Sequence, residues 1–217
     1  MRALFLNGPS GNLFSAIYSA ERPQGSSSWV LFIPPFAEEL NKCRPMVSAQ
    51  ARALAKNGHN VLVADLFGTG DSDGHFSEVD WSLWKQDLCF LVDWLGAQGA
   101  QSITLWGVRA GCLLAIDTLS TLDPGAPSIN NLILWQPVTS GETFLKQFLR
   151  LKVAAAMMDG ERLAVSDLFD ASRKGESIEV AGYALSPSLV EQMSAVSMKK
   201  MAVPASITVC WIEIATS

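Results

Sequence analysis

One short stretch of the sequence, Gly107-Val108-Arg109-Ala110-Gly111, has the residue types and spacing of a tight turn that exposes one side chain. An apolar run precedes it and an apolar helix pattern follows, so Arg109 projects above the carboxyl end of a buried strand. A turn this abrupt forces a sparsely populated backbone conformation, which costs about 1–3 kcal/mol. The flanking glycines leave room where the strand and the helix approach each other. A serine or cysteine at position 109 would be an exposed nucleophile.

Arginine at position 109 changes that chemistry, because its guanidinium stays protonated and has no lone pair to offer. Arg109 can instead hold an anion, and the free N–H groups of the following helix N-terminus favour the same charge. The alternative is a buried structural arginine that pairs with a nearby carboxylate. Both interpretations stay open at this stage.

The composition limits what the chain can bind. Its 217 residues suffice for one domain, 1–217, and 49% of them are hydrophobic while 17% are charged. With a net charge of −5 and no long basic run, nucleic-acid binding is not expected. No apolar run approaches the roughly 20 residues that cross a bilayer. The N-terminal sequence alternates between apolar and polar residues and lacks the continuous apolar core of a signal peptide, so we expect a cytoplasmic protein.

The metal-ligating residue types are few and scattered. The four cysteines are expected to be free, buried thiols, and no C-x-x-C pattern or partnered histidine predicts a metal or a cofactor. Cys112 falls in the first turn of the elbow helix, where a thiol pKa can be lowered, but a core role is favoured over a nucleophilic one. The cysteines of the chain are Cys43, Cys89, Cys112 and Cys210, and its histidines are His59 and His75.

The elements that position Arg109 follow an alternating order. Two short strands at 3–7 and 13–19 form a predicted hairpin, and continuous apolar runs at 29–33, 61–65 and 132–135 are typical of strands buried on both faces. Amphipathic helices are predicted at 41–57 and 80–98. Apolar strands separated by helices indicate a mostly parallel α/β sheet with helices on both faces.

The character of the sequence changes after residue 140. Helical patterns at 141–158 and 186–201 flank a mixed stretch, so 141–201 is predicted to be a helical lid inserted above the carboxyl ends of the strands. A last apolar strand at 206–214 ends three residues before the C-terminus. We therefore expect this strand to lie at an open sheet edge that pairs with a second chain, for instance in a homodimer.

Three motifs together resemble the α/β-hydrolase superfamily. The elbow 107–111 matches its G-x-S-x-G turn except at Arg109, the loop 65–72 resembles its D-x-x-G-x-G-x-S loop, and 34–39 takes the place of its oxyanion-hole loop. The run 34–42 followed by the arginine-bearing elbow is similar to the exosortase A system-associated hydrolase 2 family. That family is encoded beside bacterial exosortase and exopolysaccharide genes. By this resemblance the C-terminal strand and helix of the fold are missing.

The resemblance implies roles for a few residues. The oxyanion hole would use the N–H of Ala110 together with one from Phe36 or Ala37. The triad itself fails, because Arg109 replaces the nucleophile, no acid follows the last strand, and neither His59 nor His75 is placed as the base. Ser72 is expected to cap backbone groups in its loop.

Glu38 and Glu39 lie on the loop that faces the elbow. One of them is a candidate partner of Arg109, and the alternative is that both are solvated carboxylates at a helix start. Our first hypothesis is a fold member without a working triad that binds a small anionic or acyl ligand, or a partner protein. The second is an active ester or thioester hydrolase in which Glu38 or Asp71 activates water and Arg109 stabilises an oxyanion. The third is an interaction module that pairs through its open sheet edge.

Overall fold

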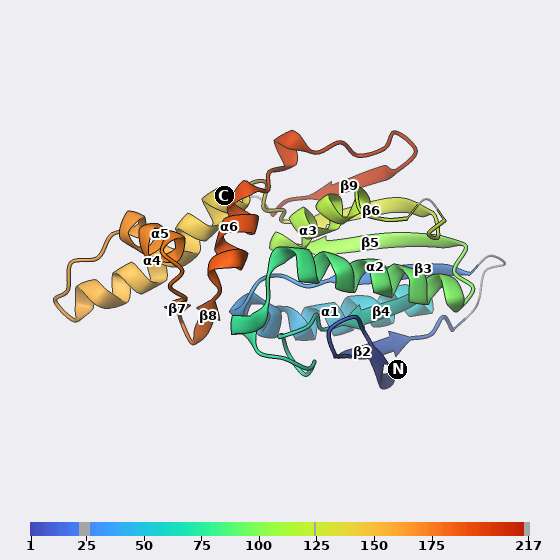
Figure 1. Ribbon diagram of the computed structural model, residues 1–217. Helices are drawn as coiled ribbons and strands as arrows, with labels where there is room; N and C mark the ends of the chain where they lie inside the picture. Colours follow the sequence, from blue (N-terminus) through green and yellow to red (C-terminus); the bar gives the residue numbers. More distant parts are fainter. Residues whose placement is uncertain (22–26, 124, 215–217) are drawn as a thin grey trace.

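A seven-stranded sheet forms the centre of the molecule, and the computed structural model describes residues 1–21, 27–123 and 125–214 (Figure 1). The strand order is β1-β2-β4-β3-β5-β6-β9, in which β1 and β2 run antiparallel to their neighbours and the other five strands are parallel. The strands are β1 (Arg2–Asn7), β2 (Asn12–Tyr18), β3 (Ser28–Ile33), β4 (Asn60–Ala64), β5 (Ser102–Val108), β6 (Ile129–Trp135) and β9 (Thr208–Ile212).

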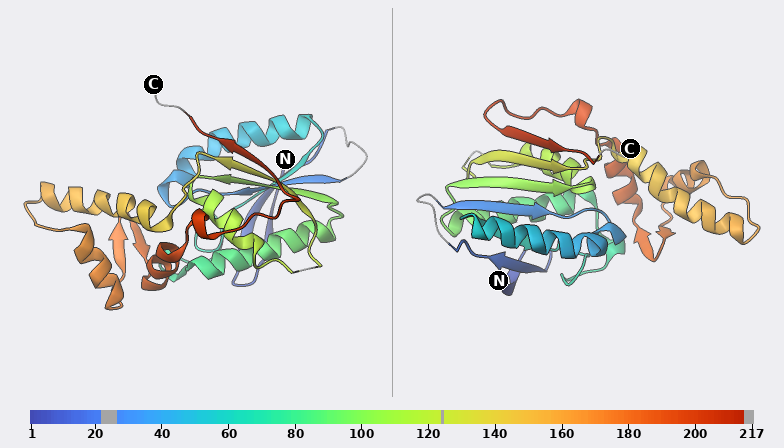
Figure 2. Two further views of the ribbon diagram at one scale, coloured as in Figure 1. Left: turned by 90° about the horizontal axis from the view of Figure 1, so that it is seen from above. Right: turned by 180° about the vertical axis from the view of Figure 1, so that it is seen from behind.

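Helices cover both faces of this sheet, as expected. Helix α1 (Glu38–Lys56) lies on one face, and α2 (Trp81–Ala97) and α3 (Ala110–Leu119) lie on the other (Figure 2). Alternate residues of β3 serve the two layers, since Leu31 packs with the α2 and α3 side and Phe32 packs with the α1 side. This alternation confirms that the continuous apolar runs are strands buried on both faces.

Helix α1 begins earlier than the predicted start at residue 41. Its first residue is Glu38, because the backbone turns sharply at Ala37, after Pro34, Pro35 and Phe36 have followed the end of β3. Glu38 and Glu39 thus occupy the first helical turn, where the free N–H groups of the helix N-terminus stabilise acidic side chains.

The segment 141–201 is inserted between β6 and β9 and lies at the carboxyl end of the sheet (Figure 1). Its α6 packs on α2, and the 3-10 turn η1 (Phe76–Glu78) of the main domain contacts β8. Besides the expected helices it contains a two-stranded ribbon, which the sequence patterns did not indicate. Its elements are α4 (Gly141–Met158), α5 (Val165–Arg173), β7 (Ile178–Val180), β8 (Tyr183–Leu185), α6 (Pro187–Ala195) and the 3-10 turn η2 (Met198–Lys200). That this segment opens as a lid stays a prediction.

Candidate functional site

The turn between β5 and α3 has the strained geometry that the glycine spacing predicted. Arg109 has φ 53° and ψ −118°, a conformation that residues other than glycine rarely adopt. Its N–H donates to the carbonyl of Trp135 at 3.0 Å, and its carbonyl accepts from Val138 at 3.2 Å. The end of β6 and the residues after it therefore hold the turn in place.

The two glycines of the elbow are required by close backbone contacts. A Cβ on Gly107 would lie 2.7 Å from the Cα and N atoms of Cys112. A Cβ on Gly111 would lie 2.4 Å from the carbonyl oxygen of Ile33 and 2.5 Å from that of Pro34. Helix α3 therefore begins against the end of β3, and this contact confirms the expected close approach.

A second turn of the same kind leads from β3 into α1. Ala37 has φ 50° and ψ −127°, close to the torsion angles of Arg109. Among the described residues, neither the N–H of Ala37 nor that of Ala110 donates a hydrogen bond to another protein group. Both residues line one small cavity of about 20 Å³, together with Pro34, Pro35, Phe36, Leu66, Thr69, Trp81, Trp84, Gly111 and Leu114. The structure thus brings the three predicted oxyanion-hole residues together, and their role stays a prediction.

Arg109 pairs with Glu39. The Nε of Arg109 donates to Oε1 of Glu39 at 3.2 Å, and the two side chains are 34% and 28% exposed. Glu38 instead lies 4.0 Å from the exposed Lys42, one turn further along α1. The pairing with the elbow is thus found for Glu39, and the alternative that both glutamates are solvated is wrong, although both do start a helix.

The carboxyl of Glu39 is short of partners. Burial raises its pKa above the usual value even though the Arg109 guanidinium acts in the opposite direction, and the neighbouring Glu38 adds to the rise. The Oε2 atoms of Glu38 and Glu39 are buried without a hydrogen-bond partner in the described residues. Burial, with the charge of Glu38, also raises the pKa of Tyr183 on β8. The site therefore holds one cation and two carboxylates with unused bonding capacity.

Aromatic rings fill the space above the oxyanion loop. The ring of Phe36 makes edge contacts with Phe76, Trp84, Phe144 and Phe148, at centroid distances of 5.2 to 5.9 Å. Phe144 and Phe148 come from α4 of the inserted segment. Sequence reasoning missed this cluster, although the four-residue spacing of the two α4 phenylalanines was a signal that they share a helix face.

The histidines lie apart from the elbow. The Nδ1 of His59 lies 3.1 Å from the Oγ of Ser28, beside the start of β3 at the amino end of the sheet. His75 is exposed and heads η1, where its N–H donates to Glu78. The amino-end position expected for His59 is confirmed, and that neither histidine serves as the base stays a prediction.

The other candidate side chains have structural partners. Ser72 donates to the carbonyl of Asp65 at 2.6 Å and accepts from the N–H of Phe14, which confirms its capping role. Asp71 is exposed and does not line the cavity below the elbow. The structure therefore gives no support to Asp71 as a water-activating group.

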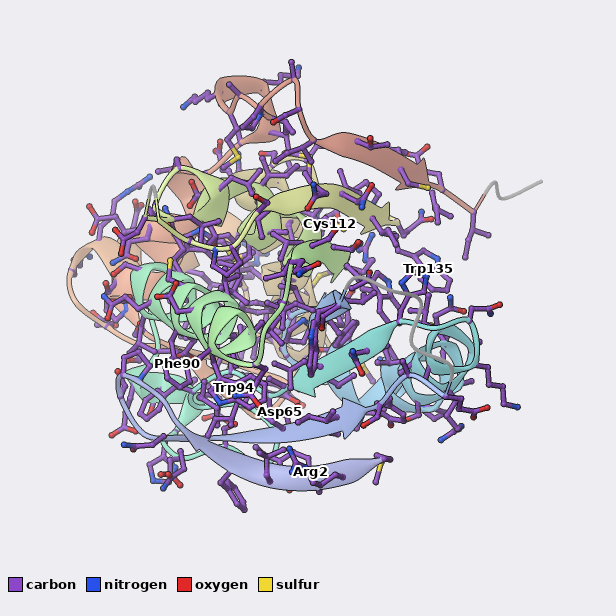
Figure 3. The ribbon with its side chains drawn as sticks, turned by 90° about the vertical axis from the view of Figure 1, so that its right-hand side faces the viewer. Arg2, Asp65, Phe90, Trp94, Cys112 and Trp135 are labelled. Carbon is purple, nitrogen blue, oxygen red and sulfur yellow. The ribbon has the colours of Figure 1, made fainter. Side chains whose placement is uncertain are left out.

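Cys112 is a core residue. It is buried, and burial raises the pKa of its thiol to about 12, so the lowering expected from the helix N-terminus is outweighed. Its Sγ lies 3.6 Å from the carbonyl of Trp135 (Figure 3). All four cysteines are free, but the expectation that they are buried holds for Cys112 alone, because Cys210 is exposed and the other two are partly exposed.

Two further features concern residues 1–21, 27–123 and 125–214. In these ranges no three side chains of His, Cys, Asp or Glu gather closely enough to hold a metal ion. Nor does any helix there combine the length and apolarity that a bilayer crossing requires.

Solved structures resemble this chain, whereas no protein-family model and no curated protein matches it. Est1E from Butyrivibrio proteoclasticus with ferulic acid aligns with a TM-score of 0.65 and 17% identity, over 91% of this chain and 72% of that one. Mouse alpha/beta hydrolase domain-containing protein 10 aligns with a TM-score of 0.65 and 17% identity, over 97% of this chain and 76% of that one. XC6422 from Xanthomonas campestris, a serine hydrolase without lid, gives 0.53 and 25%, over 63% of this chain and 61% of that one.

These alignments agree with the sheet order and the elbow. The chain has the α/β-hydrolase fold, with a mostly parallel sheet and helices on both faces. It spans about three-fifths of the length of XC6422. Activity and ligand do not follow from the fold, because one fold carries many functions.

Proposed function

We propose that this chain binds a small ligand through an anionic or acyl group at Arg109 and does not work through a Ser-His-acid triad. The observation that supports this most directly is the arginine itself, held on the strained elbow by backbone hydrogen bonds and one-third exposed. A fixed cation above a helix N-terminus is an anion-binding arrangement. The triad chemistry has no counterpart, since the elbow side chain cannot be a nucleophile.

The guanidinium has donors to offer. Glu39 accepts from its Nε, and in the described residues no other hydrogen bond engages the two terminal nitrogens of Arg109. A carboxylate or phosphate on the ligand would accept from those nitrogens, in a charge-assisted contact. The N–H groups of Ala37 and Ala110 lie on the cavity beside it and would bind a carbonyl oxygen of an acyl group.

The ligand also needs space that the structure keeps closed. The cavity of about 20 Å³ holds no more than a water-sized group. Phe144 and Phe148 of α4 cover its apolar side by packing on Phe36. Acyl binding therefore requires the 141–201 segment to move, which is the predicted role of this segment as a lid.

The test is ligand-induced stabilisation. Thermal unfolding is measured for wild type, Arg109→Gln and the surface control Arg173→Gln with acetate, butyrate, octanoate, inorganic phosphate and sulfate. We expect at least one anion to raise the Tm of wild type and of the control, and the apparent affinity to fall at least tenfold in Arg109→Gln. No shift with any of these anions, or an equal shift in Arg109→Gln, would overturn the proposal.

A second candidate is an ester or thioester hydrolase with non-standard residues. It is favoured by one observation, the shared cavity of Ala37 and Ala110, whose N–H groups have no protein partner. Glu38 would activate water and Arg109 would stabilise the oxyanion. Turnover of short p-nitrophenyl esters or acyl thioesters, measured from acid to basic pH and lost in Glu38→Gln, would support this candidate. An inactive wild type would remove it.

The biological setting stays a proposal as well. The link to exosortase and exopolysaccharide systems rests on the resemblance of the run 34–42 and of the elbow, and a cytoplasmic location rests on the N-terminal sequence.

A further inference from the structure

Helix α4 carries apolar side chains on its solvent side. The helix projects away from the sheet (Figure 1), and α5, α6 and β7 pack on it from one side (Figure 2). Leu151, Met157 and Met158 are 48%, 68% and 89% exposed, although all three are large and apolar. Leu151, Ala154, Ala155 and Met158 recur at helical spacing, and all four are exposed, so they form an apolar strip along one face. A contiguous exposed apolar surface marks a site of interaction.

The apolar strip is separate from the side of α4 that packs within the molecule. At about 100° per residue, Leu149 and Ala156 face away from the strip, and both are buried. The strip instead continues the line of Phe144 and Phe148, which pack on Phe36 beside the elbow cavity. One face of α4 therefore covers the cavity with its first half and is exposed to solvent in its second half.

The charges of α4 favour an anionic partner. Residues 143–158 include three basic residues and no acidic one, although the chain as a whole carries a net charge of −5. Asp159 and Glu161 follow only after the helix has ended. Glu142, the acidic residue that precedes this stretch, already pairs with Lys146 at 2.6 Å. The three basic residues are Lys146, Arg150 and Lys152.

Arg150 and Lys152 flank the apolar strip. Each is one residue from Leu151, so the two side chains leave the helix about 100° to either side of it. Neither forms an ion pair in the part of the chain that the structure describes. Basic side chains placed in this way lay their apolar stems along a nonpolar surface and keep their charged ends in a polar layer.

We propose that the solvent side of α4 binds the surface of an anionic lipid bilayer. A helix with an apolar strip between two cations lies in the plane of such a surface, where the strip enters the headgroup boundary and the cations contact lipid phosphates. A bilayer suits this convex surface, because lipids rearrange around a protruding side chain such as Met158, whereas a folded partner would need a matching groove. This binding goes beyond the proposed function and does not depend on the elbow.

Vesicle flotation tests the proposal on the full chain. Wild type is mixed with vesicles of phosphatidylcholine and phosphatidylglycerol in equal parts, and with vesicles of phosphatidylcholine alone. We expect it to float with the anionic vesicles, to bind the neutral ones at least tenfold more weakly, and to lose affinity as salt is raised. Absence of binding to the anionic vesicles, or equal binding to both kinds, would overturn the proposal.

A matched pair of double variants separates the local cations from the net charge. Arg150→Gln combined with Lys152→Gln should weaken binding to the anionic vesicles at least tenfold, because each cation at the surface contributes about fivefold. The control, Arg52→Gln combined with Lys56→Gln, removes the same charge from exposed positions of α1 and should bind like wild type. An equal loss in both double variants would show that net charge alone attracts the chain, and the proposal would be wrong.

A second pair of variants tests the apolar strip. Leu151→Ser combined with Met158→Ser should weaken vesicle binding at least tenfold, whereas Phe5→Ser, at an apolar position of β1 that is 59% exposed, should leave it unchanged. Unchanged binding in the strip variant would contradict the proposal. So would a wild-type dimer, seen by sedimentation velocity without vesicles, that the strip variant dissociates, because a second copy would then cover the strip.

Vesicle binding and anion binding at the elbow can fail independently. Arg109→Gln should float with the anionic vesicles like wild type, because Arg109 lies outside the exposed half of α4. Vesicle binding that is lost in Arg109→Gln as strongly as in the strip variant would place the lipid contact at the elbow and overturn the proposal.

Discussion

The two strand-to-helix turns of this molecule share one backbone shape and differ in everything that surrounds it. Ala37 and Arg109 have nearly equal torsion angles, and each follows a buried strand of the sheet. Two residues further on, the first turn carries Glu39 and the second requires Gly111. The difference arises because α3 begins against the carbonyl oxygens of Ile33 and Pro34, whereas α1 begins closer to the surface.

This comparison separates scaffold from chemistry. Both turns present a helix N-terminus with a free N–H toward the same cavity, so each turn supplies one backbone hydrogen-bond donor there. The elbow side chain is what differs, since position 37 carries a methyl group and position 109 a cation. The site therefore depends on Arg109 and on the carboxylate that α1 places beside it.

The largest expected effect comes from adding a side chain at Gly111, where α3 begins in close contact with the backbone of β3. Gly111→Ala places a Cβ 2.4 Å from the Ile33 carbonyl, so we expect a loss of about 4 kcal/mol in unfolding free energy or failure to fold. Gly125→Ala, which has no neighbour within 4 Å, serves as the control and should be nearly neutral. Urea unfolding measures both. A loss below about 1 kcal/mol in Gly111→Ala would show that the two helix starts are equally tolerant.

The effect of Arg109 on the pKa of Glu39 can be compared with Asp87, a buried carboxyl that has no cation beside it. Asp87 accepts from the N–H of Phe67 at 2.8 Å, its Oδ1 has no partner in the described residues, and burial raises its pKa to about 6. A carboxyl whose pKa is raised on folding stabilises the protein below pH 4, and this contribution is lost as pH rises through 6. We expect a loss of about 3 kcal/mol between pH 4 and 7.

Chemical denaturation across this pH range measures the effect. Asp87→Asn should flatten the profile, and an Asp159→Asn variant, changed at an exposed position, should leave it unchanged. If wild type gains stability between pH 4 and 7, Asp87 is ionised in the folded protein and the interpretation of its burial is wrong.

The pair at the elbow should show coupling of intermediate size. Glu39→Ala leaves Arg109 without its carboxylate, so the single variant should lose more stability than Glu39→Ala combined with Arg109→Ala. Because both side chains are about one-third exposed, we expect a coupling energy of about 0.5–1 kcal/mol. A double-mutant cycle of unfolding free energies measures it. Strict additivity would mean that the contact contributes nothing.

The smallest effect tests whether the two turns are strained alike. Ala37→Gly should stabilise the protein by up to about 1 kcal/mol, because glycine adopts φ 50° without strain. Arg109→Gly relieves the same strain but also loses the contact with Glu39, so its gain should be smaller. Differential scanning calorimetry compares the two variants. Destabilisation by Ala37→Gly would show that the turn at residue 37 is unstrained.

The fold and the elbow followed from sequence because their causes are local. Continuous apolar runs marked the buried strands, and the glycines at 107 and 111 marked a close approach that the structure confirms. The order of the loops made Glu38 and Glu39 candidate partners of Arg109, but it left open whether either of them pairs with it, since that depends on where α1 begins.

Other features depend on contacts between distant segments. Nothing near Phe36 in the sequence shows that Phe144 and Phe148 pack on it, because the inserted segment folds back over the sheet. The rise in the Cys112 pKa likewise comes from burial by several elements. The second strained turn, at Ala37, has no flanking glycine and so gave no signal.

The central claim is that the elbow presents a cation and no nucleophile works beside it. Intact-mass spectrometry after incubation with a fluorophosphonate probe tests this directly, with an active serine hydrolase treated in parallel to show that the probe reacts. The account predicts that the chain keeps its unmodified mass while the reference enzyme is fully labelled. A stoichiometric adduct on one serine, located by peptide mapping, would contradict the account and identify the nucleophile.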